Sequence, residues 1–202
     1  MAKTTAKTKA ATKTTTKAKT KTKNKYDKYI ISGQQPGDPP QSGAKIAWVN
    51  NDKFKGSHQY HAHWVYPTPR NIKGMKDWHD MAHGPHEHKQ PEVIFHIGSD
   101  PDNPLDLGGE VIFYLGKEKE KHVINKSCMV YLPAGFIHSP WMVHKVKRPF
   151  VIVTVMQEAI HTEQPHPEIC TEEENKHMMY IEQGYKSKAR KTIMPDGVKT
   201  EW

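Results

Sequence analysis

The sequence has few cysteines and no long apolar run. Two cysteines, Cys128 and Cys170, among 202 residues do not form the disulfide framework that is typical of small secreted proteins, so we expect a reduced, cytoplasmic setting. No stretch of about 18 consecutive apolar residues is present, which argues against a membrane-spanning helix. The N-terminal residues lack the apolar segment of a secretory signal, so none is expected.

The positive charge is confined to one end of the chain. The formal net charge is +8, and residues 1–25 contain nine lysines and no acidic residue, which leaves the remainder near −1. We therefore predict that residues 1–28 form a disordered Lys/Thr-rich tail. Such a tail could contact polyanions non-specifically, touch an anionic membrane surface, direct targeting or act as a solubilising arm. The rest of the chain shows no nucleic-acid-binding motif, so no specific nucleic acid partner is expected.

The remaining chain divides by composition into three segments. Residues 29–44 are rich in Gly and Pro and indicate a linker or arm. Residues 45–160 contain many short runs of β-branched and aromatic residues separated by turn residues, and no long helical period, which predicts an all-β sandwich or barrel. Residues 161–202 form a C-terminal extension, in which we expect one short helix over 171–182 with Thr171 as its N-cap.

A metal-binding pattern lies in the middle of the predicted strands. Fourteen histidines are present in the chain, and histidine is the commonest metal ligand. His86 and His88 point the same way on an extended strand, and Glu92 opens the next strand after a break at Pro91. His138 follows a tight turn some forty residues later. Three imidazoles and one carboxylate suit a divalent transition metal ion.

These residues resemble the two signature motifs of the cupin superfamily. The first motif, His-x-His followed by Glu and Gly, is matched by His86, His88, Glu92 and Gly98. The second motif, Pro-x-Gly-x-x-His, is matched by Pro133, Gly135 and His138. The resemblance covers about residues 45–156 and implies a cupin-type double-stranded β-helix (a jelly-roll barrel) with the four metal ligands named above. Met142 stands where the family usually has asparagine, so the chain is identified as a divergent single-domain member.

Other interpretations of the histidines stay open. His-x-His on a strand is often a pair of exposed imidazoles, and some cupins keep the barrel without binding a metal. His61 and His63 form a second such pair, but nothing partners them at a suitable separation, which disfavours a second metal site. His79 and His83 have helical spacing in a short stretch that is more typical of a loop, from which either could overhang the pocket mouth.

Three further residues are candidates for the pocket. His96 shares strand parity with Glu92, so it could act as a catalytic acid/base; the alternative is a hydrogen-bonded core histidine. Met142 and His144 share parity with His138 and are predicted to line the substrate pocket, whereas Trp141 would face the other way. Ordinary core or rim positions are the alternative for each.

The outward side chains of the strand that begins at Glu92 are apolar, which indicates that another protein surface covers them. Val93, Phe95 and Ile97 point outward and need a cover. A homodimer interface is one solution, and the family resemblance supports it; packing by the chain's own N- or C-terminal arm is the other.

The predicted function follows from the metal site. We expect a metal-dependent enzyme that acts on a small oxygen-rich organic molecule, because a four-ligand site leaves positions for a substrate. Cupins catalyse dioxygenase, isomerase, decarboxylase and lyase reactions; we favour a dioxygenase, and Fe(II) among Fe, Mn, Ni, Co, Zn and Cu. The alternative is a non-enzymatic sensor or storage module that binds a metal or a small molecule.

Overall fold

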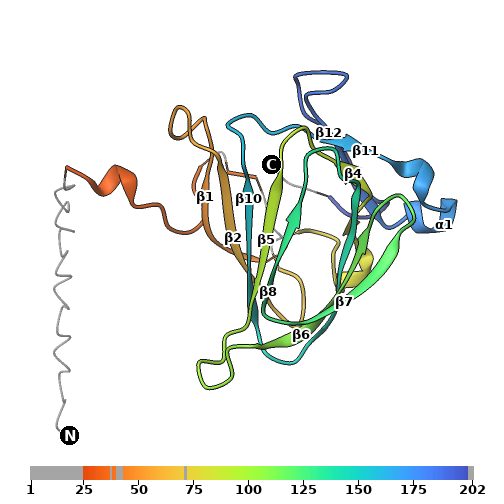
Figure 1. Cartoon of the computed structure of the whole chain (residues 1–202), viewed down its shortest axis with the longest axis horizontal. Coiled ribbons are helices and arrows are strands. Elements are labelled where there is room, and N and C mark those ends of the chain that lie inside the picture. Colours follow the sequence, from red (N-terminus) through yellow and green to blue (C-terminus); the bar gives the residue numbers. More distant parts are fainter. Residues whose placement is uncertain (1–24, 37, 40–42, 71, 200–202) are drawn as a thin grey trace, which may run out of the picture. The chain divides into compact units, whose positions relative to one another are not determined.

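A computed structural model describes most of the chain in two compact units, residues 1–30 and 31–202. The described residues are 25–36, 38–39, 43–70 and 72–199. Most of the predicted disordered tail, up to residue 24, lies outside them. In the first unit, the described residues form a short 3-10 helix, η1 (Asp27–Tyr29). All other elements belong to the second unit (Figure 1).

One sheet of the second unit has five strands. Their order is β1 (Ala44–Val49), β2 (Gln59–Val65), β10 (Phe150–Met156), β5 (Glu92–Ile97) and β8 (Cys128–Leu132), and each adjacent pair is antiparallel. These segments are rich in Val, Ile and aromatic residues, which fit a pleated surface. The central strand, β10, pairs with β2 on one side and β5 on the other over its length, so residues far apart in sequence share this sheet.

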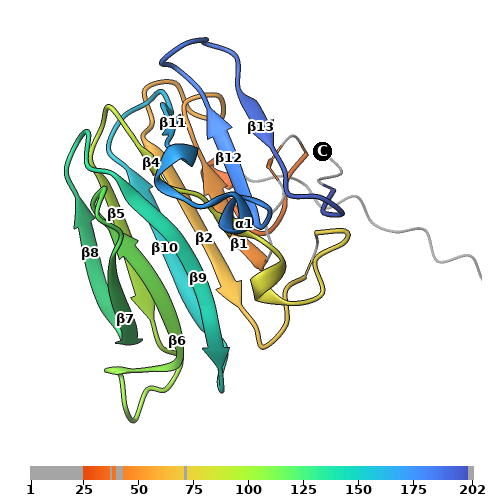
Figure 2. The ribbon, with the colours of Figure 1, turned by 90° about the vertical axis from the view of Figure 1, so that its right-hand side faces the viewer.

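The second sheet is longer and less regular. Its path runs through β11 (Gln164–Pro165), β4 (His86–Glu87), β9 (His138–Val146), β3 (Ala82–His83), β12 (Met178–Glu182) and β13 (Lys191–Ile193). Strand β6 (Asp106–Leu115) pairs with β9 and with β7 (Glu120–Lys126). The C-terminal extension therefore contributes strands to this sheet, and β12 joins it in parallel with β3. Figure 2 shows β11 and β12 beside β4 and α1.

The core lies between the two sheets. Side chains from the five-stranded sheet, such as Ile94 and Phe150, pack in one apolar cluster with Val111, Phe113 and Val143 of the other sheet. The alternation of buried side chains along each strand supplies these contacts. The predicted all-β, double-stranded β-helix architecture is thus confirmed.

The predicted helix over 171–182 is shorter than expected. The N-cap is correct, because the Thr171 side chain accepts from the amide of Glu174 and Glu174 bonds back, but α1 covers only Glu172–Asn175. Residues 178–182 form β12 instead, because Met178 and Tyr180 alternate inward and become buried against β3. Pairing between distant segments therefore overrides local helix propensity here.

The other helices are single 3-10 turns. They are η2 (Trp78–Asp80) and η3 (Pro167–Ile169). None of the helices in the described part of the chain has the length and hydropathy that crossing a membrane requires.

Candidate metal centre

Four side chains converge at one end of the core. His86 on β4 lies opposite His138 on β9 in the ladder between these strands. Glu92 opens β5, and His88 lies between β4 and β5. One ligand atom from each of the four lies within 4.8 Å of those of the others. All four are nearly inaccessible to solvent, with exposed fractions of 2–4 %.

A glycine turn brings His138 to this point. Gly135 has a φ of +71°, a left-handed conformation that disfavours other residues. Its amide donates to the carbonyl oxygen of His88 at 2.7 Å, and Phe136 closes the turn onto Pro133. The Pro-x-Gly-x-x-His motif is thus tied directly to the first motif by a backbone hydrogen bond.

Backbone carbonyls fix the orientation of the three imidazoles. The Nδ1 atoms of His86, His88 and His138 each contact a carbonyl oxygen. The carbonyls belong, in that order, to Gly84, Thr162 and Phe136. A carbonyl oxygen only accepts, so each Nδ1 carries the hydrogen, and in the neutral ring Nε2 presents its lone pair. Metal-binding histidines are typically oriented in this way by a second hydrogen bond.

The Nε2 lone pairs of His88 and His138 face a carboxylate. Glu92 Oε2 lies 3.0 Å from His138 Nε2 and 3.5 Å from His88 Nε2. These three atoms are buried, and none has a hydrogen-bond partner of acceptable geometry among the described residues. Lone pairs that face a carboxylate repel it unless a cation lies between them. The donor set therefore fits a cation bound at this point.

Electrostatics prepares the same groups for a metal. Burial raises the pKa of Glu92, but the imidazoles of His138 and His88 outweigh it and hold that pKa well below its usual range, so the carboxylate is ionised. Burial and the adjacent His83 and His138 rings keep the pKa of His86 well below its usual value, so this ring is neutral. Burial lowers the pKa of His88, but Glu92 raises it more. Metals bind ionised carboxylates and neutral imidazoles, so these pKa shifts favour the metal-binding forms of Glu92 and His86, whereas a cation would have to displace a proton from His88.

A cavity of about 250 Å³ opens beside the four ligands. His86, Glu92 and His138 line it, and most of its other lining side chains are apolar or aromatic. Trp48, Trp78 and Trp141 all contribute to its wall. The cavity gives a small organic molecule access to the candidate centre.

A second buried carboxylate lies next to the first site and was not predicted. Glu163 is 1 % exposed and also lines the cavity. Its two oxygens contact His83 Nε2 at 2.6 Å and His161 Nε2 at 3.1 Å. Burial raises the pKa of Glu163, but these imidazoles and that of His86 hold it well below its usual range.

His83 of β3 and residues 161–163 of the C-terminal extension lie next to the candidate centre. His83 stacks on His86 with ring centroids 4.0 Å apart, and Thr162 supplies the carbonyl that orients His88. Ligand atoms of Glu163 lie close to those of His86 and His88 in two further groups of potential ligands. The sequence signal was a His-x-Glu pair, His161 and Glu163, whose contact with the barrel depends on the pairing of β11 with β4.

The expected pocket residues Met142 and His144 lie away from the cavity, which corrects the predicted parity. Strand β9 has a bulge opposite β6. Leu115 pairs with His138 and Phe113 pairs with Trp141, so a step of two residues on β6 corresponds to three residues on β9. One extra residue reverses which side chains face inward. Trp141 and Val143 consequently line the cavity.

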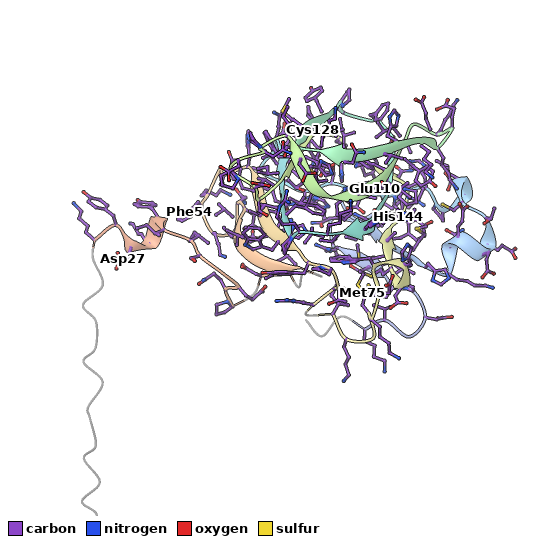
Figure 3. All side chains as sticks on the ribbon, turned by 90° about the horizontal axis from the view of Figure 1, so that it is seen from below. Asp27, Phe54, Met75, Glu110, Cys128 and His144 are labelled. Carbon is purple, nitrogen blue, oxygen red and sulfur yellow. The ribbon has the colours of Figure 1, made fainter. Side chains whose placement is uncertain are left out.

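The two displaced side chains have other contacts. Met142 packs against the small cluster of Ala82, Met178 and Tyr180. His144 is half exposed, and its Nε2 lies 3.8 Å from Glu110 Oε1 (Figure 3).

His96 is in the core and not among the residues that line the cavity. It is fully buried, and its Nε2 accepts a hydrogen bond from Trp141 Nε1 at 3.0 Å. Burial lowers the pKa of His96 to about 4. This placement favours the alternative of a core histidine over the predicted acid/base.

The remaining histidine candidates also have defined positions. His61 and His63 are buried and line the cavity, whereas His79 is exposed beside Asp77. Of the loop pair, only His83 reaches the cavity.

No family model and no curated protein matches the sequence. Among solved structures, the polyketide cyclase RemF from Streptomyces resistomycificus is 10% identical, with 68% of this chain and 81% of that chain covered and a TM-score of 0.42. A protein with a double-stranded β-helix domain from Klebsiella pneumoniae is 12% identical, with 75% and 98% covered and a TM-score of 0.38. An oxalate oxidase is also 12% identical, with 78% and 72% covered and a TM-score of 0.42.

The chain has a cupin-type fold. The two mostly antiparallel sheets around one core and the His/His/Glu/His cluster carry this assignment. Oxalate decarboxylase from Bacillus subtilis is 13% identical, with 65% of this chain and 30% of that chain covered and a TM-score of 0.41.

Proposed function

We propose that the protein is a metal-dependent enzyme that acts on a small organic molecule inside the cavity. One observation carries the proposal: three histidines whose Nδ1 atoms are fixed by backbone carbonyls gather around the ionised carboxylate of Glu92, which the Nε2 atoms of His88 and His138 face. The adjoining cavity supports an enzyme, because a structural metal site has no need of one.

His86, His88, Glu92 and His138 would hold one divalent transition metal ion. Such an ion can polarise a substrate oxygen, acidify a bound water or, as Fe(II), take part in dioxygen chemistry. Glu163 holds His83 by a hydrogen bond and His83 stacks on His86, so this pair would help to keep the His86 ring in place.

Metal analysis of the untagged protein tests the binding part of the proposal. We expect about one ion per chain, lost in His86→Ala and in His138→Ala while the β-sheet circular dichroism persists. His144→Ala is the matched control, because it removes an exposed histidine from the same strand as His138. Full occupancy in the double variant His86→Ala/His138→Ala would contradict the ligand assignment.

Turnover tests the enzymatic part. We propose Fe(II)-dependent oxygenation as the first reaction class, compared by product formation in air and under anaerobic conditions with small oxygen-bearing substrates. Oxygen-independent turnover would indicate an isomerase, decarboxylase or lyase. Tight binding without any product would indicate a sensor or storage protein instead.

We further propose that two copies pair through the outer face of the five-stranded sheet. Val93, Phe95 and Ile97 lie on this face in register with apolar neighbours on β10 and β8. The C-terminal strands β12 and β13 belong to the other sheet, which leaves a second copy as the cover we favour. Both cysteines are free, in keeping with a proposed reduced, cytoplasmic setting.

A further inference from the structure

The second His-x-His pair occupies the inner face of β2 and takes no part in the candidate metal centre. His61 and His63 are 8 % and 6 % exposed, and both line the cavity. Their rings stack with centroids 4.8 Å apart and an interplanar angle of 14°. In the sheet they lie opposite Thr154 and Ile152 of β10.

Neither ring is anchored by a hydrogen bond among the described residues. His61 Nε2 and His63 Nδ1 are buried without a partner. This distinguishes the pair from the three candidate metal ligands, whose Nδ1 atoms all contact carbonyl oxygens. Buried polar groups without partners are costly, so this pair needs a partner in the cavity, which water or a polar atom of a ligand can supply.

Both imidazoles are neutral. Burial lowers the pKa of His63 to about 4, assisted by the positive charge of Lys45. Burial and the neighbouring His63 and Lys45 hold the pKa of His61 well below its usual value. A neutral imidazole has one donor and one acceptor nitrogen, which suits a hydroxyl or carbonyl oxygen. It provides no charge to compensate a buried anion.

Three tryptophans contribute aromatic, apolar surface to the wall of the same cavity. Trp78 Nε1 donates to the carbonyl oxygen of Tyr66 at 2.8 Å, and Trp141 Nε1 donates to His96. Because these N–H groups are bonded elsewhere, the two indoles offer the cavity only apolar surface. Trp48, which contacts His61 at a ring-centroid distance of 5.0 Å, extends this surface toward the histidine pair. Flat rings pack well against such walls.

We propose that the cavity binds a small, uncharged aromatic molecule whose hydroxyl or carbonyl oxygen is hydrogen-bonded by His61 and His63. The volume of about 250 Å³ lies below the usual range of ligand pockets, which restricts the ligand to one or two rings. This inference names a substrate class for the site described under Proposed function and so rests on that function.

Calorimetric titration of the full chain with three probes tests the inference. The probes are phenol, toluene, which lacks the oxygen, and benzenesulfonate, a weakly coordinating anion of similar ring size. We expect phenol to bind roughly tenfold more tightly than toluene, as one net hydrogen bond allows, and benzenesulfonate to bind more weakly than phenol. In His61→Leu and His63→Leu the phenol preference should disappear while toluene still binds. His58→Leu, an exposed histidine next to β2, should behave as the wild type.

The outcomes distinguish a failure of this inference from a failure of the proposed metal-dependent function. Equal binding of phenol and toluene, tighter binding of benzenesulfonate, no binding of phenol at millimolar concentration, or a phenol preference unchanged in both leucine variants would overturn the inference. Metal content measured on the same samples reports on the folded centre. A metal-free protein that discriminates phenol through His61 and His63 would overturn the proposed enzyme alone. A metal-loaded protein without discrimination would overturn this inference alone.

Discussion

The inner face of the five-stranded sheet carries buried polar side chains, and its outer face carries apolar ones. This is the reverse of the usual pattern in antiparallel sheets that face solvent on one side. Such sheets commonly bury apolar side chains and expose polar ones. Here the inner face carries Glu92, His96, His61 and His63 among its apolar residues, and all four are buried. Three of these buried polar groups, Glu92, His61 and His63, line the cavity, whereas His96 is hydrogen-bonded in the core. The apolar side chains on the outer face need a separate explanation.

The outer face is apolar across all five strands. Two full rows and one partial row of paired residues cross it. The rows are Val49, Tyr60, Val155, Val93 and Tyr131; Ala47, Ala62, Val153, Phe95 and Met129; and Trp64, Val151 and Ile97. Several members are about half exposed, such as Met129 at 57 % and Tyr131 at 54 %. A contiguous apolar surface of this width is typical of an interface. The comparison therefore supports the two proposals, ligand chemistry at the inner face and association at the outer one.

Removing an inner carboxylate should have the largest effect. In Glu92→Gln, the neutral amide faces the Nε2 atoms of His88 and His138 without charge to bind a cation. We expect metal affinity to fall by more than the roughly 10–100-fold that loss of an outer hydrogen-bond partner costs. Competition with a chelator, followed by elemental analysis, measures the change. An unchanged affinity would show that the inner face does not hold the ion through Glu92.

Charging the outer face should break association and leave the inner face intact. Tyr131→Lys and Met129→Lys place like charges on both copies of the proposed interface, so we expect the dimer dissociation constant to rise by about a hundredfold or more. Analytical ultracentrifugation measures the mass. Val123→Lys, at an equally exposed apolar residue on β7 of the other sheet, is the matched control.

Two results would contradict this assignment. A wild-type protein that is monomeric at all concentrations would exclude the interface. A dimer that dissociates when residues 1–24 are deleted, with the sheet residues unchanged, would assign the cover to the N-terminal segment.

The inner histidines should also make the protein sensitive to acid. Burial lowers the pKa of His96 from 6.5 to about 4, so the unfolded chain takes up its proton first as the pH falls. This neutral ring therefore contributes stability above pH 6.5 that is lost progressively between pH 6.5 and about 4. The slope in this window should be about 1.4 kcal/mol per pH unit steeper in the wild type than in His96→Leu. Urea unfolding at several pH values measures it, and equal slopes would mean that His96 titrates normally.

Much of this arrangement was predictable because it is local. The spacing of His86, His88 and Glu92 follows from strand alternation, and the turn at Gly135 places His138 through a short motif. The structure brings these side chains together as expected. The outward parity of Val93 and Phe95 is likewise a consequence of the two-residue strand period.

The remainder depends on long-range pairing that the sequence does not display. The bulge in β9 arises where this strand meets β6, so the exchange of Met142 for Trp141 at the cavity is invisible locally. Glu163 reaches the centre only because β11 pairs with β4, and residues 178–182 become a strand only because β3 is available. In each instance a distant partner decides between two locally acceptable conformations.

The smallest expected effect tests the bulge itself. If the parity of β9 is reversed after His138, His144 lies outside the barrel, and its contact with Glu110 is a half-exposed polar contact. Such contacts contribute at most about 1 kcal/mol, so His144→Ala should leave stability within that amount and change neither metal content nor phenol binding. Trp141 lies on the same strand and lines the cavity. Trp141→Phe removes the hydrogen bond to His96 and should lower the free energy of unfolding by about 1–3 kcal/mol. Thermal and urea unfolding of the two variants give the comparison. If His144→Ala weakened ligand binding instead, the result would contradict the bulge. It would mean that side chains alternate regularly along β9 and that Trp141 faces outward.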